Sequence, residues 1–169
     1  MPIIVFLFTL PLTLTLGWGW VVLLVLLGTA HKLKWNSTLV LTAQWRPWVE
    51  KFVHSSATFG RGTIYQSIDR GNFRVRAHAA VHIRQVEDMM LLSLLVGLVL
   101  GFWSDDWRVA FLVWWSGGLW QIPNHITAVL RGGDAHIDAE HERSAYAQTD
   151  IQGGGQSWLE RHRERTMFR

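Results

Sequence analysis

The chain alternates between long apolar runs and polar blocks. Residues 3–30 carry no charged side chain, and a helix needs roughly 20 apolar residues to cross a bilayer. This run predicts an N-terminal transmembrane helix over 1–30, bent at Pro11. A cleaved signal peptide is the alternative, but the run is long for a signal and its start lacks basic residues. We therefore expect an uncleaved anchor.

A second apolar region covers residues 89–120 and is split by the acidic sequence SDDW at 104–107. Each half has about 15 residues, which is short for a full membrane span. One interpretation is a helical hairpin with an acidic tip that crosses a thin bilayer or dips partway into it. The other is a pair of buried helices that pack against the first apolar segment. We expect the membrane hairpin.

The polar blocks predict strands first and a helix afterwards. Residues 35–68 contain short runs rich in β-branched residues, and glycines at 60 and 62 indicate a close backbone approach or a bulge. From Phe73 onward no Gly or Pro interrupts the chain until after residue 96. This helix would begin amphipathic and become wholly apolar after Asp88, so that it runs from the polar layer into the membrane.

The C-terminal part predicts further helices. Residues 136–148 indicate a short polar helix with Asp138 near its start. The glycines at 153–155 predict a flexible joint. The basic tail either lies on anionic headgroups as an interfacial helix or is a charged, solvated end. The fold class expected is an α+β membrane protein with a transmembrane helix, a short antiparallel sheet, a helix running into a hairpin, and C-terminal helices. Its expected parts are 1–30, 31–150 and 151–169.

Charge predicts the orientation in the membrane. The blocks 31–88 and 121–169 are rich in Lys and Arg, whereas the tip at 104–106 carries only acidic residues. The positive-inside tendency places both blocks on the cytoplasmic side and the N-terminus and tip outside. Eleven tryptophans, nearly all beside apolar runs, are typical of a membrane interface. We expect membrane lipids as partners, no nucleic acid, and possible homo-oligomers.

His78 and His82 are the first candidate chemistry. Four residues along a helix place two side chains on one face, one turn apart, so both imidazoles can reach one Zn²⁺. The chain has no cysteine, so any third ligand must be His, Asp or Glu. Alone, such a pair is more often two unrelated histidines. Two histidines on one helix face cannot hold a haem from both sides.

The sequence around this pair resembles the H-E-x-x-H-x-x-Q helix of small gluzincin-type zinc metallopeptidases. In that family an edge strand precedes the helix, and a later E-R-x-A helix supplies a glutamate ligand. Here HAAVHIRQ covers 78–85, TFGRGTIY covers 58–65, and ERSA covers 142–145. The three motifs occur in the family's order, within about half of the chain.

The resemblance implies a role for each matching position. His78 and His82 would be zinc ligands, Glu142 the third ligand, and Gln85 a support for the site; His141 is the alternative third ligand. The peptide or protein substrate would pair with the strand at 58–65, which includes Gly60, Gly62 and Thr63.

Ala79 departs from the family pattern, because the family's catalytic glutamate stands there. A methyl group cannot accept a proton from water, although that glutamate is not a ligand and zinc binding does not depend on it. Three explanations remain open: a deliberate glutamate-to-alanine change, a natural pseudo-protease, or a false resemblance. Glu87 and Asp88 point elsewhere by helix phase, and Asp138 and Glu140 are unsupported substitutes.

The sequence therefore supports two hypotheses. The first is a membrane-bound zinc metallopeptidase-like protein whose site faces the cytoplasm and which is inactive as written. The second is a non-enzymatic small membrane protein, such as an assembly, lysis or partner-binding subunit, in which the histidines are incidental.

Overall fold

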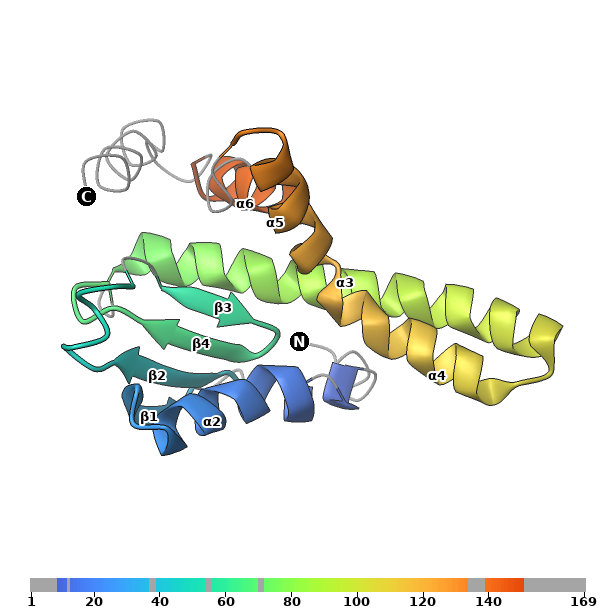
Figure 1. Cartoon of the computed structure of the whole chain (residues 1–169), viewed down its shortest axis with the longest axis horizontal. Helices are drawn as coiled ribbons and strands as arrows, with labels where there is room; N and C mark the ends of the chain where they lie inside the picture. Colours follow the sequence, from blue (N-terminus) through green and yellow to red (C-terminus); the bar gives the residue numbers. More distant parts are fainter. Residues whose placement is uncertain are drawn as a thin grey trace.

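The fold consists mainly of helices around one short sheet (Figure 1). The computed structural model describes residues 9–11, 13–36, 39–53, 56–69, 72–133 and 139–150. Asp138 and the tail at 151–169 lie outside these residues. The elements in chain order are η1 (Thr13–Gly19), α2 (Trp20–Leu26), β1 (Ala30–Trp35), β2 (Leu41–Trp45), β3 (Ala57–Phe59), β4 (Gly62–Tyr65), α3 (Phe73–Ser104), α4 (Trp107–Ser116), η2 (Gly117–Leu119), α5 (Gln121–Leu130) and α6 (Glu140–Asp150).

The sheet is mixed, which corrects the expected antiparallel arrangement. Its strand order is β1-β2-β4-β3. β1 pairs with β2 and β3 with β4 in antiparallel fashion, whereas β2 and β4 run parallel. The reason is that the chain leaves β2, forms β3 at the edge of the sheet, and then turns back to form β4 between β2 and β3. The segment 58–65, expected as one strand, is therefore part of a β-hairpin.

The turn of this hairpin is formed by Gly60 and Arg61. Gly60 has a φ of 50°, which suits the first position of a two-residue hairpin turn. The guanidinium of Arg61 is buried and forms an ion pair with Glu87 of α3. This ion pair attaches the hairpin to the middle of the long helix.

The sheet core lies under the N-terminal helix. Leu41, Ala43 and Ile64 form a buried cluster with Val21 of α2. At Gly62 an added Cβ would lie 1.9 Å from the carbonyl oxygen of Gly17. The close backbone approach expected at this glycine is thus the contact between β4 and η1. The described part of the apolar N-terminal segment thus packs against the sheet: η1 contacts β4, and α2 contacts β1, β2 and β4.

Helix α3 begins at Phe73, as predicted. The side chain of Asn72 accepts a hydrogen bond from the Arg74 amide at 3.0 Å and so caps the first turn. The helix ends at Ser104 and is followed by Asp105, whose φ is 52°, and Asp106 caps the start of α4. The expected hairpin with an acidic tip is therefore present, and it projects beyond the sheet (Figure 1).

The two arms of this hairpin are in close contact. An added Cβ at Gly97 would lie 2.6 Å from the carbonyl oxygen of Ala110, and one at Gly101 would lie 2.8 Å from the Ala110 Cβ. Small residues at four-residue spacing allow helices to approach this closely.

Two helices are long and apolar enough to cross a membrane, Thr9–Leu26 and Phe73–Ser104. Only 22% of the most apolar stretch of α3 is buried. Near the tip, Phe102 and Trp103 have exposed fractions of 81% and 84%.

Candidate metal centre

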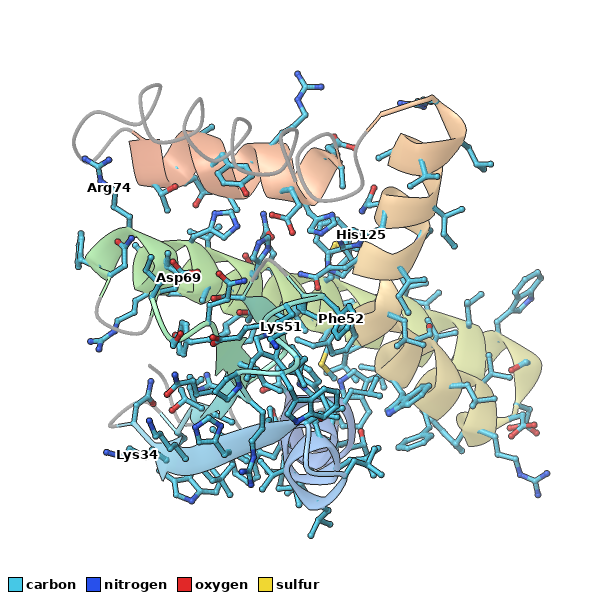
Figure 2. All side chains as sticks on the ribbon, turned by 60° about the vertical axis from the view of Figure 1, so that its left-hand side comes forward. Lys34, Lys51, Phe52, Asp69, Arg74 and His125 are labelled. Atoms are coloured by element: carbon cyan, nitrogen blue, oxygen red, sulfur yellow. The ribbon has the colours of Figure 1, made fainter. Side chains whose placement is uncertain are left out.

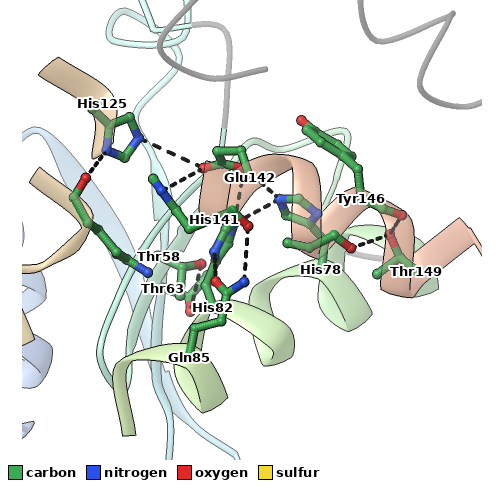
Figure 3. Close-up of polar contacts among 12 residues, drawn as sticks. Thr58, Thr63, His78, His82, Gln85, His125, His141, Glu142, Tyr146 and Thr149 are labelled. Atoms are coloured by element: carbon green, nitrogen blue, oxygen red, sulfur yellow. Dashed lines mark hydrogen bonds and ion pairs between the residues drawn. The ribbon is translucent and has the colours of Figure 1, made fainter. Parts of the chain in front are cut away.

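The candidate site lies where α6 crosses α3. Both histidines of α3 point toward α6, and Glu142, in the first turn of α6, points back toward them (Figure 3). Helix α5 lies on the same side of α3 and brings His125 toward this point (Figure 2). Residues from both polar blocks of the sequence thus meet at one place.

Three ligand atoms converge tightly. The Oε2 atom of Glu142 lies 3.1 Å from the Nε2 atoms of both His78 and His82. The two Nε2 atoms are 2.9 Å apart. His78, His82 and Glu142 form a group that can hold a metal ion.

The hydrogen bonds around His82 orient its Nε2 toward Glu142. The side-chain amide of Gln85 donates to the carbonyl oxygen of His141 at 3.0 Å, so its oxygen faces His82. The Nδ1–H of His82 donates to that oxygen at 3.0 Å. With its Nδ1–H used in this way, His82 has Nε2 left as the ring atom that faces the Glu142 carboxylate, which only accepts. A metal ion or a shared proton between these atoms would bind both.

The spacing is close to that of a tetrahedral metal site, for which zinc gives a reference. With Zn–N and Zn–O bonds of about 2.0–2.1 Å, neighbouring ligand atoms lie roughly 3.4 Å apart. The observed separations of 2.9–3.1 Å need to widen by only a few tenths of an ångström. The support given to His82 by Gln85 is the kind that orients imidazole ligands in metal sites.

His125 and His141 form a second group around the same carboxylate. The other oxygen of Glu142, Oε1, lies 3.9 Å from Nε2 of His125 and 3.7 Å from Nε2 of His141. His125, His141 and Glu142 also form a group that can hold a metal ion. The sequence offered His141 as an alternative to Glu142 as third ligand. In the structure His141 faces the Oε1 atom of Glu142, whereas His78 and His82 face Oε2.

A pocket of about 270 Å³ opens onto both groups. It is lined by residues of α3, α5 and α6 and by Ala57, Thr58 and Phe59 of β3. The buried Ala79 lines it too. Among the described lining residues Glu142 is the only acid.

The other acids considered from the sequence are placed elsewhere. Glu87 pairs with Arg61, and Asp88 and Glu140 are exposed. Burial raises the pKa of the Glu87 carboxyl, and Arg61 opposes that shift.

The residues expected to bind a peptide strand occupy different positions. Gly60 is in the turn, whereas Gly62 and Thr63 belong to β4, which has a neighbour on both sides. Among the described residues, the edge strand that lines the pocket is instead β3, so Thr58 is the residue of the predicted segment that lies there.

His125 is the site residue that the sequence did not single out. It lies on α5, between the hairpin and α6, and no motif marks it. Its position depends on how α5 folds back over α3 after the hairpin, which the local sequence does not specify.

No protein-family model matches the sequence, and neither a curated protein nor a solved structure matches the chain. The description of the site therefore depends on its own geometry.

Proposed function

We propose that this chain is an integral membrane protein that binds Zn²⁺ through His78, His82 and Glu142 in the manner of a gluzincin-type metallopeptidase. Ala79 leaves it with little or no peptide hydrolysis. The observation that carries the proposal is the convergence of three ligand atoms, from helices 60 residues apart in sequence, within 3.1 Å of one another.

Zinc is the metal that suits this donor set. Two imidazoles and one carboxylate are typical of catalytic zinc sites, which keep a further position open. The pocket provides space on that side. When bound, the ion would polarise a peptide carbonyl and lower the pKa of water.

The chain's own residues support the rest of a peptidase site only in part. Gln85 fixes the orientation of His82. The methyl group of Ala79 lies in the pocket wall, where the family's glutamate would take a proton from water and pass it to the leaving amine. A methyl group does neither, so binding without turnover is the expected state.

Of the two edge strands in the described sheet, β3 is the one that lines the pocket, and a peptide substrate would dock along it. In a two-residue hairpin the residues that flank the turn form a hydrogen-bonded pair, and such pairs alternate along the strands. Phe59 and Gly62 flank this turn, so Thr58 is expected to present its N–H and C=O to the open edge. A peptide added there would pass the pocket with its backbone paired.

The membrane insertion proposed here uses the hairpin of α3 and α4, whose apolar side chains are exposed near the tip. The basic residues of 31–88 favour a site at the cytoplasmic face. The peptide would then be cytoplasmic or lie close to the membrane surface.

The test has two steps. Detergent-purified protein is first analysed for zinc, and Ala79→Glu is then assayed with a peptide library. We expect bound zinc in both proteins and cleavage only with Ala79→Glu. Ala80→Glu is the matched control, because residue 80 is the exposed neighbour on the same helix. A zinc-free protein whose Ala79→Glu variant cuts nothing refutes the proposal and favours the non-enzymatic alternative.

A further inference from the structure

We propose that His125, His141 and Glu142 form a second divalent-cation site, so that the Glu142 carboxylate bridges two ions. This inference rests on the proposed role of Glu142 as a ligand of the first ion. It adds a ligand pair from α5 and α6 that the H-x-x-x-H pattern does not contain.

The orientation of the carboxylate is the first observation. Oε2 faces His78 and His82, whereas Oε1 faces His125 and His141. The two oxygens thus each have a pair of imidazoles.

The distances from Oε1 of Glu142 to His125 and His141 are the next observation. At 3.7 and 3.9 Å, the Nε2 atoms are too far from Oε1 for hydrogen bonds, which are about 2.7–3.2 Å long. They are close to the roughly 3.4 Å expected between neighbouring ligands of a tetrahedral ion. The three residues offer ligand atoms within 4.8 Å of one another, so a modest contraction would bring them around one ion.

His125 is oriented as a metal ligand would be. Its Nδ1–H donates to the backbone carbonyl of Gln121 at 2.9 Å, because a carbonyl oxygen can only accept. The lone pair of Nε2 is therefore directed toward Glu142. A histidine ligand commonly donates its other N–H to a backbone carbonyl in this way, and His82 does the equivalent with Gln85.

Burial distinguishes this group from an ordinary surface cluster. The side chain of His141 has an exposed fraction of 1%, and that of Glu142 has 7%. His125, at 38%, leaves one side of the group open to the pocket. Imidazole and carboxylate donors select a borderline divalent ion such as Zn²⁺. In two-metal sites the ions are about 3.5–4 Å apart, and one bridging carboxylate can span that separation.

The experiment is a zinc titration of the full chain in detergent, followed by measurement of bound zinc per chain. We expect two ions per chain in the unaltered protein. His125→Ala and His78→Ala are each expected to retain one, because each removes a ligand from one group only. His31→Ala, a histidine of β1 far from the site in sequence, is the control and should keep two.

The outcomes separate the two proposals. One ion per chain that is lost in His78→Ala and unaffected by His125→Ala overturns the second site and leaves the first intact. No bound zinc overturns both. His141→Ala removes a buried side chain and can unfold the protein, so His125→Ala, at the pocket opening, carries the test. Tryptophan fluorescence during heating checks that each variant is folded.

Discussion

The side-chain amide of Gln85 donates to the backbone carbonyl of His141 at 3.0 Å, and this hydrogen bond joins α3 to α6 at the candidate metal centre. The same amide accepts from Nδ1 of His82 through its oxygen. One side chain therefore orients the candidate ligand His82 and contacts the helix that carries the candidate carboxylate ligand. This arrangement leads to the first prediction.

We predict that Gln85→Leu weakens zinc binding by about 10- to 100-fold, the usual effect of removing a group that orients a ligand. Leucine fills similar space but neither accepts from His82 nor donates to His141. Competition with a chelator of known affinity measures the change. The control is Arg84→Leu, because Arg84 is one residue earlier and exposed. This variant should bind zinc as the unaltered protein does. Equal weakening of zinc binding in both variants would contradict a specific role for Gln85.

The free edge of β3 leads to a prediction about substrate binding. In the Ala79→Glu background, we expect Thr58→Pro to abolish peptide cleavage while zinc content is retained, because proline removes the N–H directed at the open edge. Thr58→Val keeps the backbone donor and should still cleave. Cleavage that survives the proline substitution would show that the peptide binds elsewhere.

The buried pair of Arg61 and Glu87 predicts a dependence of stability on pH. Removal of one partner of a buried ion pair typically costs about 3–5 kcal/mol, so Arg61→Met is expected to lower the unfolding midpoint markedly at pH 7. Burial raises the pKa of Glu87 above its ordinary value, and Arg61 opposes this shift. Without Arg61 the pKa of Glu87 should therefore rise further.

The direction in which stability changes with pH follows from proton binding at Glu87. Between the ordinary pKa and the raised pKa, the folded state holds more protons at Glu87 than the unfolded state, so the contribution of Glu87 to stability increases as pH falls through that window. Arg61→Met should therefore regain part of its lost stability on acidification from pH 7 toward pH 5. The double variant Arg61→Met, Glu87→Met should lack this recovery. Thermal unfolding followed by tryptophan fluorescence measures both.

The proposed orientation in the membrane can be tested because the chain has no cysteine. In oriented vesicles, we expect Asp105→Cys to react with a membrane-impermeant maleimide from the external side only. Lys51→Cys should react only from the cytoplasmic side. Labelling of both positions from the same side would rule out a hairpin that crosses the bilayer.

Much of the helical structure could be predicted because its signals are local. The start of α3 at Phe73 follows from the run without Gly or Pro that begins there, and the structure adds Asn72 as its cap. The tip follows from the acidic sequence at 104–106. A spacing of four residues was enough to place His78 and His82 on one face.

The sheet and half of the candidate site could not be predicted in the same way, because they depend on long-range packing. The parallel pairing of β2 with β4 is decided by where β3 is placed. Gly62 proved to be required for contact with Gly17. Glu142 was identified only through a family resemblance, since nothing local places it near residues 60 positions earlier. His125 depends on the course of α5.

X-ray absorption spectroscopy at the zinc edge tests the central claim most directly, with one equivalent of zinc added to the purified protein. We predict a first shell of nitrogen and oxygen at about 2.0–2.1 Å, with outer-shell scattering from two imidazoles that is reduced in His82→Ala. A first shell of oxygen alone, with no imidazole scattering, would contradict the proposed metal centre.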